Sequence, residues 1–166
     1  MIIRKATGDE MLALWGCKDI NTASPTARFF YDNISAGNAL FWALDSGAEL
    51  IGELYVFLEL EDRAFADGKN TAYLCAFRVK KEYRGQGHGR RLMTAALAEL
   101  KERGFLRATI VVKSDEPLNI KLYRNMGFEA KIKDFFFDPC RMDENMQPAR
   151  EDKGLCLLSK DLLEER

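Results

Sequence analysis

The most constraining feature of this chain is a glycine-rich turn between a predicted strand and a predicted helix. Residues 79–89 read V-K-K-E-Y-R-G-Q-G-H-G, and the amphipathic run R-R-L-M-T-A-A-L-A-E-L-K-E-R follows directly. Three glycines at alternate positions, Gly85, Gly87 and Gly89, let the backbone adopt conformations that other residues avoid, so its N–H groups can converge on one anion. The positive end of the helix dipole adds to this attraction. The segment therefore predicts a phosphate-binding turn.

The rest of the chain predicts strands and helices on either side of this turn. Apolar periodicity and turn residues place strands at 2–6, 39–44, 50–60, 71–79, 108–113, 128–137 and 155–160. Helices are expected at 8–17, 25–34, 90–103 and 114–127, with Ser24 capping the second and Gly104 ending the third. A polar stretch at 141–153 is expected to be an exposed loop. This order predicts one α/β domain over residues 1–166, with helices covering a mixed sheet.

The charge of the chain is balanced overall but uneven locally. Lys and Arg number 25 and Asp and Glu number 26, a net charge of −1, which argues against a general nucleic-acid-binding protein. Residues 78–107 carry nine basic and three acidic side chains, an excess of +6 around the glycine turn. Residues 52–67 carry five acidic side chains and one basic one, an excess of −4. One region therefore suits an anion and another suits a cation.

The cysteines and the histidine are too scattered to predict a metal site. Cys17, Cys75, Cys140 and Cys156 form no C-x-x-C pair, and His88 is the only histidine. No apolar run reaches the length of a membrane span, and the first residues lack the apolar segment of a secretion signal. We therefore expect a cytoplasmic protein with reduced thiols, no metal and no membrane partner.

Two common nucleotide-binding motifs do not fit the turn. A Rossmann fingerprint would need a glycine where Arg90 or Leu92 stands, and a Walker A loop would close with G-K-[ST]. The pattern Arg84-x-x-Gly87-x-Gly89, set between strand and helix and followed by L-Y-R-N-M-G-F at 122–128, resembles the Gcn5-related N-acetyltransferases. The resemblance covers nearly the whole chain. It implies the fold of that family, an α/β fold with a mixed, mostly antiparallel sheet of about seven strands and helices on both faces.

The resemblance implies that the turn binds acetyl-CoA. In that family, the backbone of the turn holds the pyrophosphate, and the pantetheine arm pairs with the preceding strand like an added strand. The residues that this places at the coenzyme are Phe77, Arg78, Val79, Arg84, Gly85, Gln86, Gly87, His88, Gly89, Arg90, Asn119 and Tyr123. A purely structural glycine turn, with ordinary core packing for the strand, is the alternative.

The resemblance also implies direct attack of a neutral amine on the acetyl thioester in a ternary complex, without a covalent intermediate. Tyr123 matches the tyrosine that hydrogen-bonds or protonates the departing sulfur in that family, and a helix tyrosine that only packs is the alternative. Asn119 lies four residues earlier, on the same predicted helix face, and is a candidate coenzyme contact. Cys75 falls inside a strand and His88 in the turn, so no Cys–His pair suggests a nucleophilic cysteine.

The general base stays open at the level of sequence. An alkyl amine is neutral in only about one molecule in 10³ to 10⁴ at pH 7, which costs roughly 4 to 5 kcal/mol. The candidates are Glu53 and Glu59 on the third strand and Tyr73 on the fourth, the last acting through water. Strand alternation places Glu53 and Glu59 on one face, and solvent exposure of that face is the alternative to a catalytic role for either. The same alternation predicts that Tyr73, Cys75 and Phe77 share one face.

In that family, the first two helices and the loop between the last two strands form the walls of the acceptor cleft. Here these regions supply Phe29, Phe30, Tyr31, Asp32, Phe135, Phe136 and Phe137. An aromatic, partly acidic cleft suits an amine on an apolar body, although core packing would explain the same rings. The expected substrate is a small-molecule or peptide amine.

Two other classes of function stay open. One is a non-catalytic acyl-CoA sensor on the same fold, and the other is a protein-binding domain whose turn binds nothing. A monomer and a homodimer are likewise both open.

Overall fold

A seven-stranded sheet forms the centre of the computed structural model, which describes residues 1–134, 138–149 and 154–163. The strand order is β1-β2-β3-β4-β5-β7-β6, and β4 and β5 form the one parallel pair among the described strands. The strands are β1 (Ile2–Ala6), β2 (Ala39–Asp45), β3 (Leu50–Phe57), β4 (Thr71–Val79), β5 (Arg107–Lys113), β6 (Ala130–Asp134) and β7 (Leu155–Asp161).

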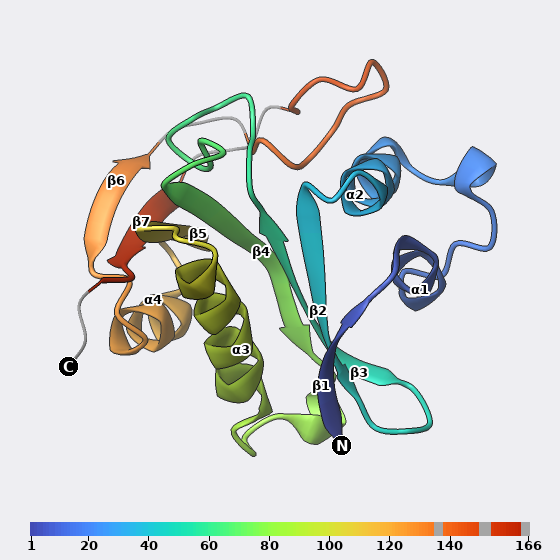
Figure 1. The fold of residues 1–166 in the computed structure, drawn as a ribbon, viewed down its shortest axis with the longest axis horizontal. Helices are drawn as coiled ribbons and strands as arrows, with labels where there is room; N and C mark the ends of the chain where they lie inside the picture. Colours follow the sequence, from blue (N-terminus) through green and yellow to red (C-terminus); the bar gives the residue numbers. More distant parts are fainter. Residues whose placement is uncertain (135–137, 150–153, 164–166) are drawn as a thin grey trace.

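In the described part of the chain, four α-helices cover the two faces of this sheet (Figure 1). Helices α1 (Gly8–Leu14) and α2 (Pro25–Ser35) pack on one face, and α3 (His88–Glu102) and α4 (Pro117–Asn125) pack on the other. Short 3-10 helices, η1 (Ile20–Thr22) and η2 (Lys81–Tyr83), lie before α2 and α3. The predicted mixed, mostly antiparallel sheet with helices on both faces is confirmed. None of the described helices has the length and hydropathy that a membrane span requires.

Strand alternation builds a separate apolar core on each face. On β3, Leu54 and Val56 point toward α3, whereas Tyr55 and Phe57 point toward α1 and α2, and all four side chains are fully buried. The predicted stripe on α3 is buried against the first of these cores, and it consists of Leu92, Met93, Ala96 and Leu100.

Capping residues explain where the helices begin and end. Thr7 and Glu10 form a reciprocal capping box at the start of α1, and Ser24 caps α2 as predicted. The prediction that the first helix reaches residue 17 is wrong, because the backbone at Gly16 turns left-handed (φ +76°) and ends α1 at Leu14. At the end of α3, Gly104 has the same left-handed conformation (φ +88°).

The parallel pairing between β4 and β5 is short. It runs from Thr71, opposite Arg107, to Leu74, opposite Ile110, and the remaining residues of the two strands do not pair with each other. The pairing of β3 with β4 shifts register just beyond this point, and Ala76 has a left-handed backbone (φ +49°). The sheet therefore opens beside the carboxyl end of β4.

This irregularity corrects one prediction about β4. Tyr73 and Cys75 pack toward α1 and α2, but Phe77 packs on the opposite face, with α3. The left-handed residue Ala76 adds one position to the strand and reverses the alternation beyond it. Tyr73, Cys75 and Phe77 therefore do not share a face.

Within the described residues, β6 is shorter than predicted, whereas β7 extends one residue beyond the strand expected at 155–160. β6 covers Ala130–Asp134 of the strand expected at 128–137, and residues 135–137 lie outside the described part of the chain. The described part of the predicted loop contains an isolated bridge between Met142 and Pro148. The backbone N–H of Met142 donates to Thr26 Oγ1 at 3.1 Å, which ties this loop to α2.

Candidate active site

The glycine turn connects β4 to the N-terminus of α3, at the lower end of that helix in Figure 1. Gly85 and Gly87 have left-handed backbones, with φ of +77° and +85°, and a β-carbon on either would meet no atom of the described residues within 4 Å. Gly89 differs, because it is helical and a β-carbon there would lie 3.1 Å from Cζ of Phe77. Two glycines therefore shape the turn, while the third lets α3 pack closely on β4.

The turn presents unpaired backbone donors. The helix begins at His88, two residues before the predicted start, and its first ladder bond runs from Arg91 N to Gly87 O at 3.1 Å. Among the described residues, no hydrogen bond engages the backbone N–H groups from Gly85 to Arg90. Such a run of free donors at a helix N-terminus favours an anion.

The side chain of Arg84 folds back onto the strand. Its Nε donates to the carbonyl oxygen of Val79 at 2.7 Å, which fixes the turn against the end of β4. Val79, one of the residues expected at the coenzyme, therefore has its carbonyl oxygen already engaged. The backbone N–H groups of the turn stay unobstructed by this contact.

A cavity of about 540 Å³ lies between the turn and α4, and we call it the turn cavity. Its size is that of a typical small-molecule site. It brings together eleven of the twelve predicted coenzyme residues, and Gln86 does not line it. The lining residues are Phe77, Arg78, Val79, Tyr83, Arg84, Gly85, Gly87, His88, Gly89, Arg90, Asn119, Leu122, Tyr123 and Met126.

Tyr123 and Asn119 project from one side of α4 into the turn cavity, as their spacing predicts. The Tyr123 ring packs edge-on against Phe128, with 6.4 Å between the ring centres. Burial raises the pKa of Tyr123, and the nearby Glu116 carboxylate raises it further, so the phenol keeps its proton at neutral pH. The Asn119 amide donates to Glu116 Oε2 at 2.7 Å.

A second cavity, of about 680 Å³, lies on the other side of β4, and we call it the Glu53 cavity. It shares two lining residues with the turn cavity, Phe77 and Arg78. The two cavities therefore meet at the carboxyl end of β4, where the sheet opens. The remaining lining residues are Leu14, Trp15, Thr26, Phe30, Glu53, Cys75, Ala76, Asp138, Cys140 and Arg141.

Glu53 is 8% exposed and is held by three side chains. Its Oε1 accepts hydrogen bonds from Trp15 Nε1 at 2.8 Å and from the Tyr55 hydroxyl at 2.9 Å. Its Oε2 forms an ion pair with Arg78 Nε at 3.3 Å. Burial, followed by the Glu53 charge, raises the pKa of Tyr55, so this hydroxyl stays a donor. These contacts hold the Glu53 carboxylate at the wall of the Glu53 cavity, so Glu53 is not a solvated surface residue.

Trp15 is a site residue that the sequence did not predict. Its ring lies under the Arg78 guanidinium, with 5.5 Å between Cζ and the ring centre. Trp15 therefore contacts both members of the Glu53–Arg78 ion pair. No local pattern signals this contact, because Trp15 and Glu53 are 38 residues apart and meet only when α1 packs on the sheet.

Two of the three candidate bases do not line the Glu53 cavity. Glu59 lies beyond the end of β3, where it pairs with Arg63 at 2.8 Å. The Tyr73 ring is buried against Phe65, and burial raises the pKa of Tyr73 well above its usual range. Glu53 is thus the one candidate of the three that reaches the junction of the two cavities.

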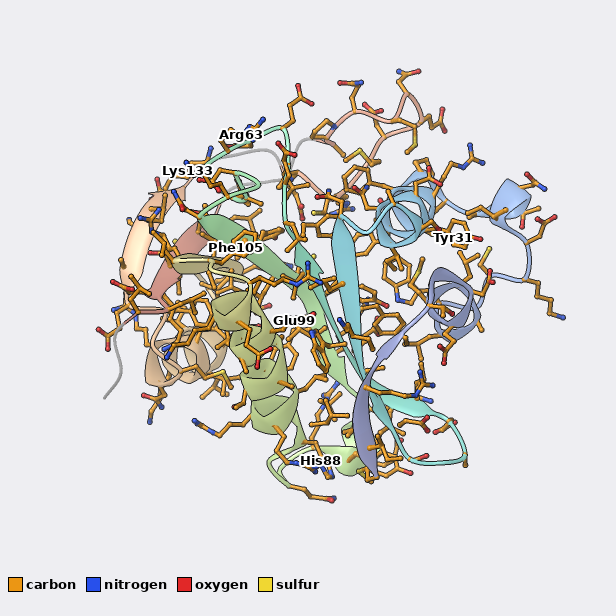
Figure 2. All side chains as sticks on the ribbon, in the orientation of Figure 1. Tyr31, Arg63, His88, Glu99, Phe105 and Lys133 are labelled. Atoms are coloured by element: carbon orange, nitrogen blue, oxygen red, sulfur yellow. The ribbon has the colours of Figure 1, made fainter. Side chains whose placement is uncertain are left out.

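The predicted acceptor residues divide between different places. Phe30 lines the Glu53 cavity, whereas Phe29 lines a separate hollow of about 770 Å³ that Arg63 and Lys133 also border. Figure 2 shows these two basic side chains close together, far from His88 at the turn. Tyr31 lies against Gly8 between α1 and α2, and residues 135–137 lie outside the described part of the chain. Nowhere in the described residues do three or more potential metal ligands cluster.

Solved structures of acetyltransferases share this architecture. A ribosomal-protein-alanine N-acetyltransferase from Brucella melitensis is 17% identical, with a TM-score of 0.66 over 97% of this chain and 99% of that one. A GNAT family acetyltransferase from Elizabethkingia anophelis, solved with acetyl-CoA bound, is 17% identical, with a TM-score of 0.62 over 96% and 97%. The PaiA N-acetyltransferase from Thermoplasma acidophilum, solved in complex with coenzyme A, is 18% identical, with a TM-score of 0.63 over 96% and 98%. At these identities the likeness shows a shared fold.

Sequence comparison assigns the family. A comparison with curated protein sequences finds no significant match. The model of the acetyltransferase (GNAT) family matches residues 9–128, which include Glu53, the glycine turn and Tyr123. On this match, the chain belongs to the GNAT acetyltransferase family.

Proposed function

We propose that this protein is an acetyl-CoA-dependent N-acetyltransferase that acts on a primary amine of a small molecule or peptide. One observation carries the proposal. A run of unpaired backbone donors, from Gly85 to Arg90, borders a cavity that meets the Glu53 cavity at Phe77 and Arg78. An anionic carrier held at the turn would thus end beside a second cleft that can admit its acceptor.

The turn fits the phosphates of coenzyme A. The open space above Gly85 and Gly87 is space that any side chain would occupy, and the amides around it need an acceptor. Acetyl-CoA supplies these phosphates and the reactive thioester. Arg84 and Arg90, both exposed at the cavity, add positive charge. Beyond Leu74, β4 does not pair with β5, and this open edge supports pairing with the pantetheine arm.

The acetyl group is transferred directly to the amine. A direct route needs a nucleophile and an acyl donor side by side, which the junction at Phe77 and Arg78 allows. A cysteine route is disfavoured, because Cys75 lines the Glu53 cavity while His88 lines the turn cavity.

Tyr123 is the proposed proton donor to the leaving sulfur. Tyr123 lines the turn cavity, and its raised pKa keeps the side chain a phenol at neutral pH. A buried phenol can donate a hydrogen bond to a sulfur that gains negative charge as the bond to the acetyl carbon breaks.

Glu53 is the proposed base for the amine. Its Oε1 already accepts two hydrogen bonds, so the remaining lone pair lies on Oε2, beside Arg78. A proton leaving the amine as it attacks would pass to this atom, directly or through one water.

Thermal unfolding with coenzyme A and acetyl-CoA tests the binding half of this proposal. A ligand at a hundredfold excess over its dissociation constant should stabilise the fold by about 2.7 kcal/mol. Release of free thiol from acetyl-CoA with a panel of amines, polyamines and peptides tests the catalytic half. Stabilisation without turnover of any amine would favour a sensor, and an unchanged melting temperature would leave the turn purely structural.

A further inference from the structure

We propose that the acceptor carries a carboxylate close to its amine, as a free amino acid does, and that Arg78 recognises this carboxylate. The inference rests on the proposed function and narrows its substrate class. Arg78 is one of the two described residues that line both the turn cavity and the Glu53 cavity. A group bound by Arg78 therefore lies next to the place where the amine must react.

The Arg78 guanidinium is held in place on two sides. Its Nε faces Glu53 Oε2 at 3.3 Å, and the ring of Trp15 lies 5.5 Å from its Cζ. Both partners are themselves fixed, because Trp15 Nε1 donates to Glu53 Oε1 at 2.8 Å. Holding the planar guanidinium in this way reduces the entropy that binding an anion would cost.

The rest of the guanidinium is available to a ligand. Within the described residues, the ion pair with Glu53 is the one polar contact of the Arg78 side chain, and it involves Nε. The two Nη groups remain, and the side chain is 57% exposed. Two parallel N–H groups match the two oxygens of a carboxylate. An amine without an anionic group would leave these donors without a protein or substrate partner.

The other walls of the Glu53 cavity fit the remainder of an amino acid. Leu14, Trp15 and Phe30 provide an apolar surface for a side chain. The ion pair with Arg78 offsets the negative charge of Glu53, so the cavity attracts a polyamine less than a lone carboxylate would. This balance favours an amino acid with an apolar side chain over a polyamine.

Matched pairs of ligands test the inference. The twenty common amino acids, and the decarboxylated amines of leucine, phenylalanine, tyrosine and tryptophan, are titrated by calorimetry into protein saturated with coenzyme A. At least one apolar amino acid should bind about ten- to hundredfold more tightly than its decarboxylated amine. Arg78→Gln should remove this difference, and Arg78→Lys, which keeps the charge but loses the fork, should retain part of it. Arg28→Gln, on the exposed face of α2, should change nothing.

Each other outcome has a definite meaning. Equal binding of an amino acid and its amine to the wild-type protein, or no binding of any amino acid, overturns the inference. So does loss of the coenzyme A thermal shift in Arg78→Gln, which would assign Arg78 to the coenzyme instead. Failure of coenzyme A to stabilise the wild-type protein would instead refute the proposed function, so the two failures are distinguishable.

Discussion

Phe77 on β4 and Gly89 in the first turn of α3 are directly apposed, since a β-carbon at position 89 would lie 3.1 Å from Cζ of the ring. We expect Gly89→Ala to push the start of α3 away from β4 by a few tenths of an ångström. The backbone donors move with it, and coenzyme A affinity, measured by calorimetry, should fall about tenfold. A second change, Phe77→Leu, should restore affinity by making room. Equal affinity of Gly89→Ala and wild type would show that this packing does not position the turn.

Gly87→Val should abolish coenzyme A binding while the far-UV circular dichroism stays native. The valine would have to adopt a left-handed backbone, and its side chain would occupy the open space above the turn. Gly47→Val is the matched control, because Gly47 has φ +94° in the β2–β3 hairpin and also meets nothing within 4 Å. Both variants should lose about 1 to 2 kcal/mol of stability, but only Gly87→Val should lose the ligand. Retained affinity in Gly87→Val would contradict the placement of the phosphates.

Tyr123→Phe should lower kcat about a hundredfold and leave the KM for acetyl-CoA nearly unchanged. Burial raises the pKa of Tyr123 above its unfolded value, so the phenol keeps its proton as pH rises through about 10. The wild-type rate should therefore increase with pH as the amine loses its proton, with no descending limb below about pH 10. A descending limb near pH 8 that disappears in Tyr123→Phe would show that the phenol titrates earlier than the structure implies.

Glu53→Gln should lower kcat about a hundredfold, because the amide cannot accept the proton of the amine. Stabilisation by coenzyme A should persist, since Glu53 does not line the turn cavity. The control is Glu59→Gln at the other glutamate considered from sequence, which lies outside both cavities. An unaltered rate in Glu53→Gln would show that Glu53 is not the base and that water accepts the proton of the amine.

His88→Leu should stabilise the protein by about 1 kcal/mol or more in urea unfolding without ligand. Both ring nitrogens of His88 are buried and have no hydrogen-bond partner among the described residues. An unsatisfied buried polar atom costs free energy that a leucine of similar size avoids. His88→Gln, which keeps buried polar atoms, should show no such gain. A less stable leucine variant would indicate that the imidazole has a bound partner.

Much of the fold could be predicted because its signals are local. Apolar runs bounded by turn residues identified β3 and β4, the helical stripe from Leu92 to Leu100 identified α3, and Ser24 ahead of Pro25 marked the start of α2. The same holds for the turn, since its glycines and the helix after it are contiguous. The side-by-side position of Asn119 and Tyr123 likewise follows from the helical repeat.

The features that were missed depend on contacts across the chain. The reversal of Phe77 arises from the left-handed residue Ala76, where the pairing of β3 with β4 slips, and no local pattern encodes it. The burial of Glu53 requires Trp15, 38 residues earlier, to pack across the sheet. The separate role of Gly89 depends on how closely α3 approaches Phe77, which spacing alone does not reveal.

Four paired positions between β4 and β5 join the two halves of the sheet. One half is β1 to β4, and the other is β5, β7 and β6. Past Leu74, the amide protons of β4 that face β5 have no ladder partner, so they should exchange rapidly with deuterated water in the free protein. A thioester carrier bound along this open edge of β4 would protect those protons from exchange. If amide exchange slows at residues 75–79 alone, the carrier is bound there before any chemistry takes place.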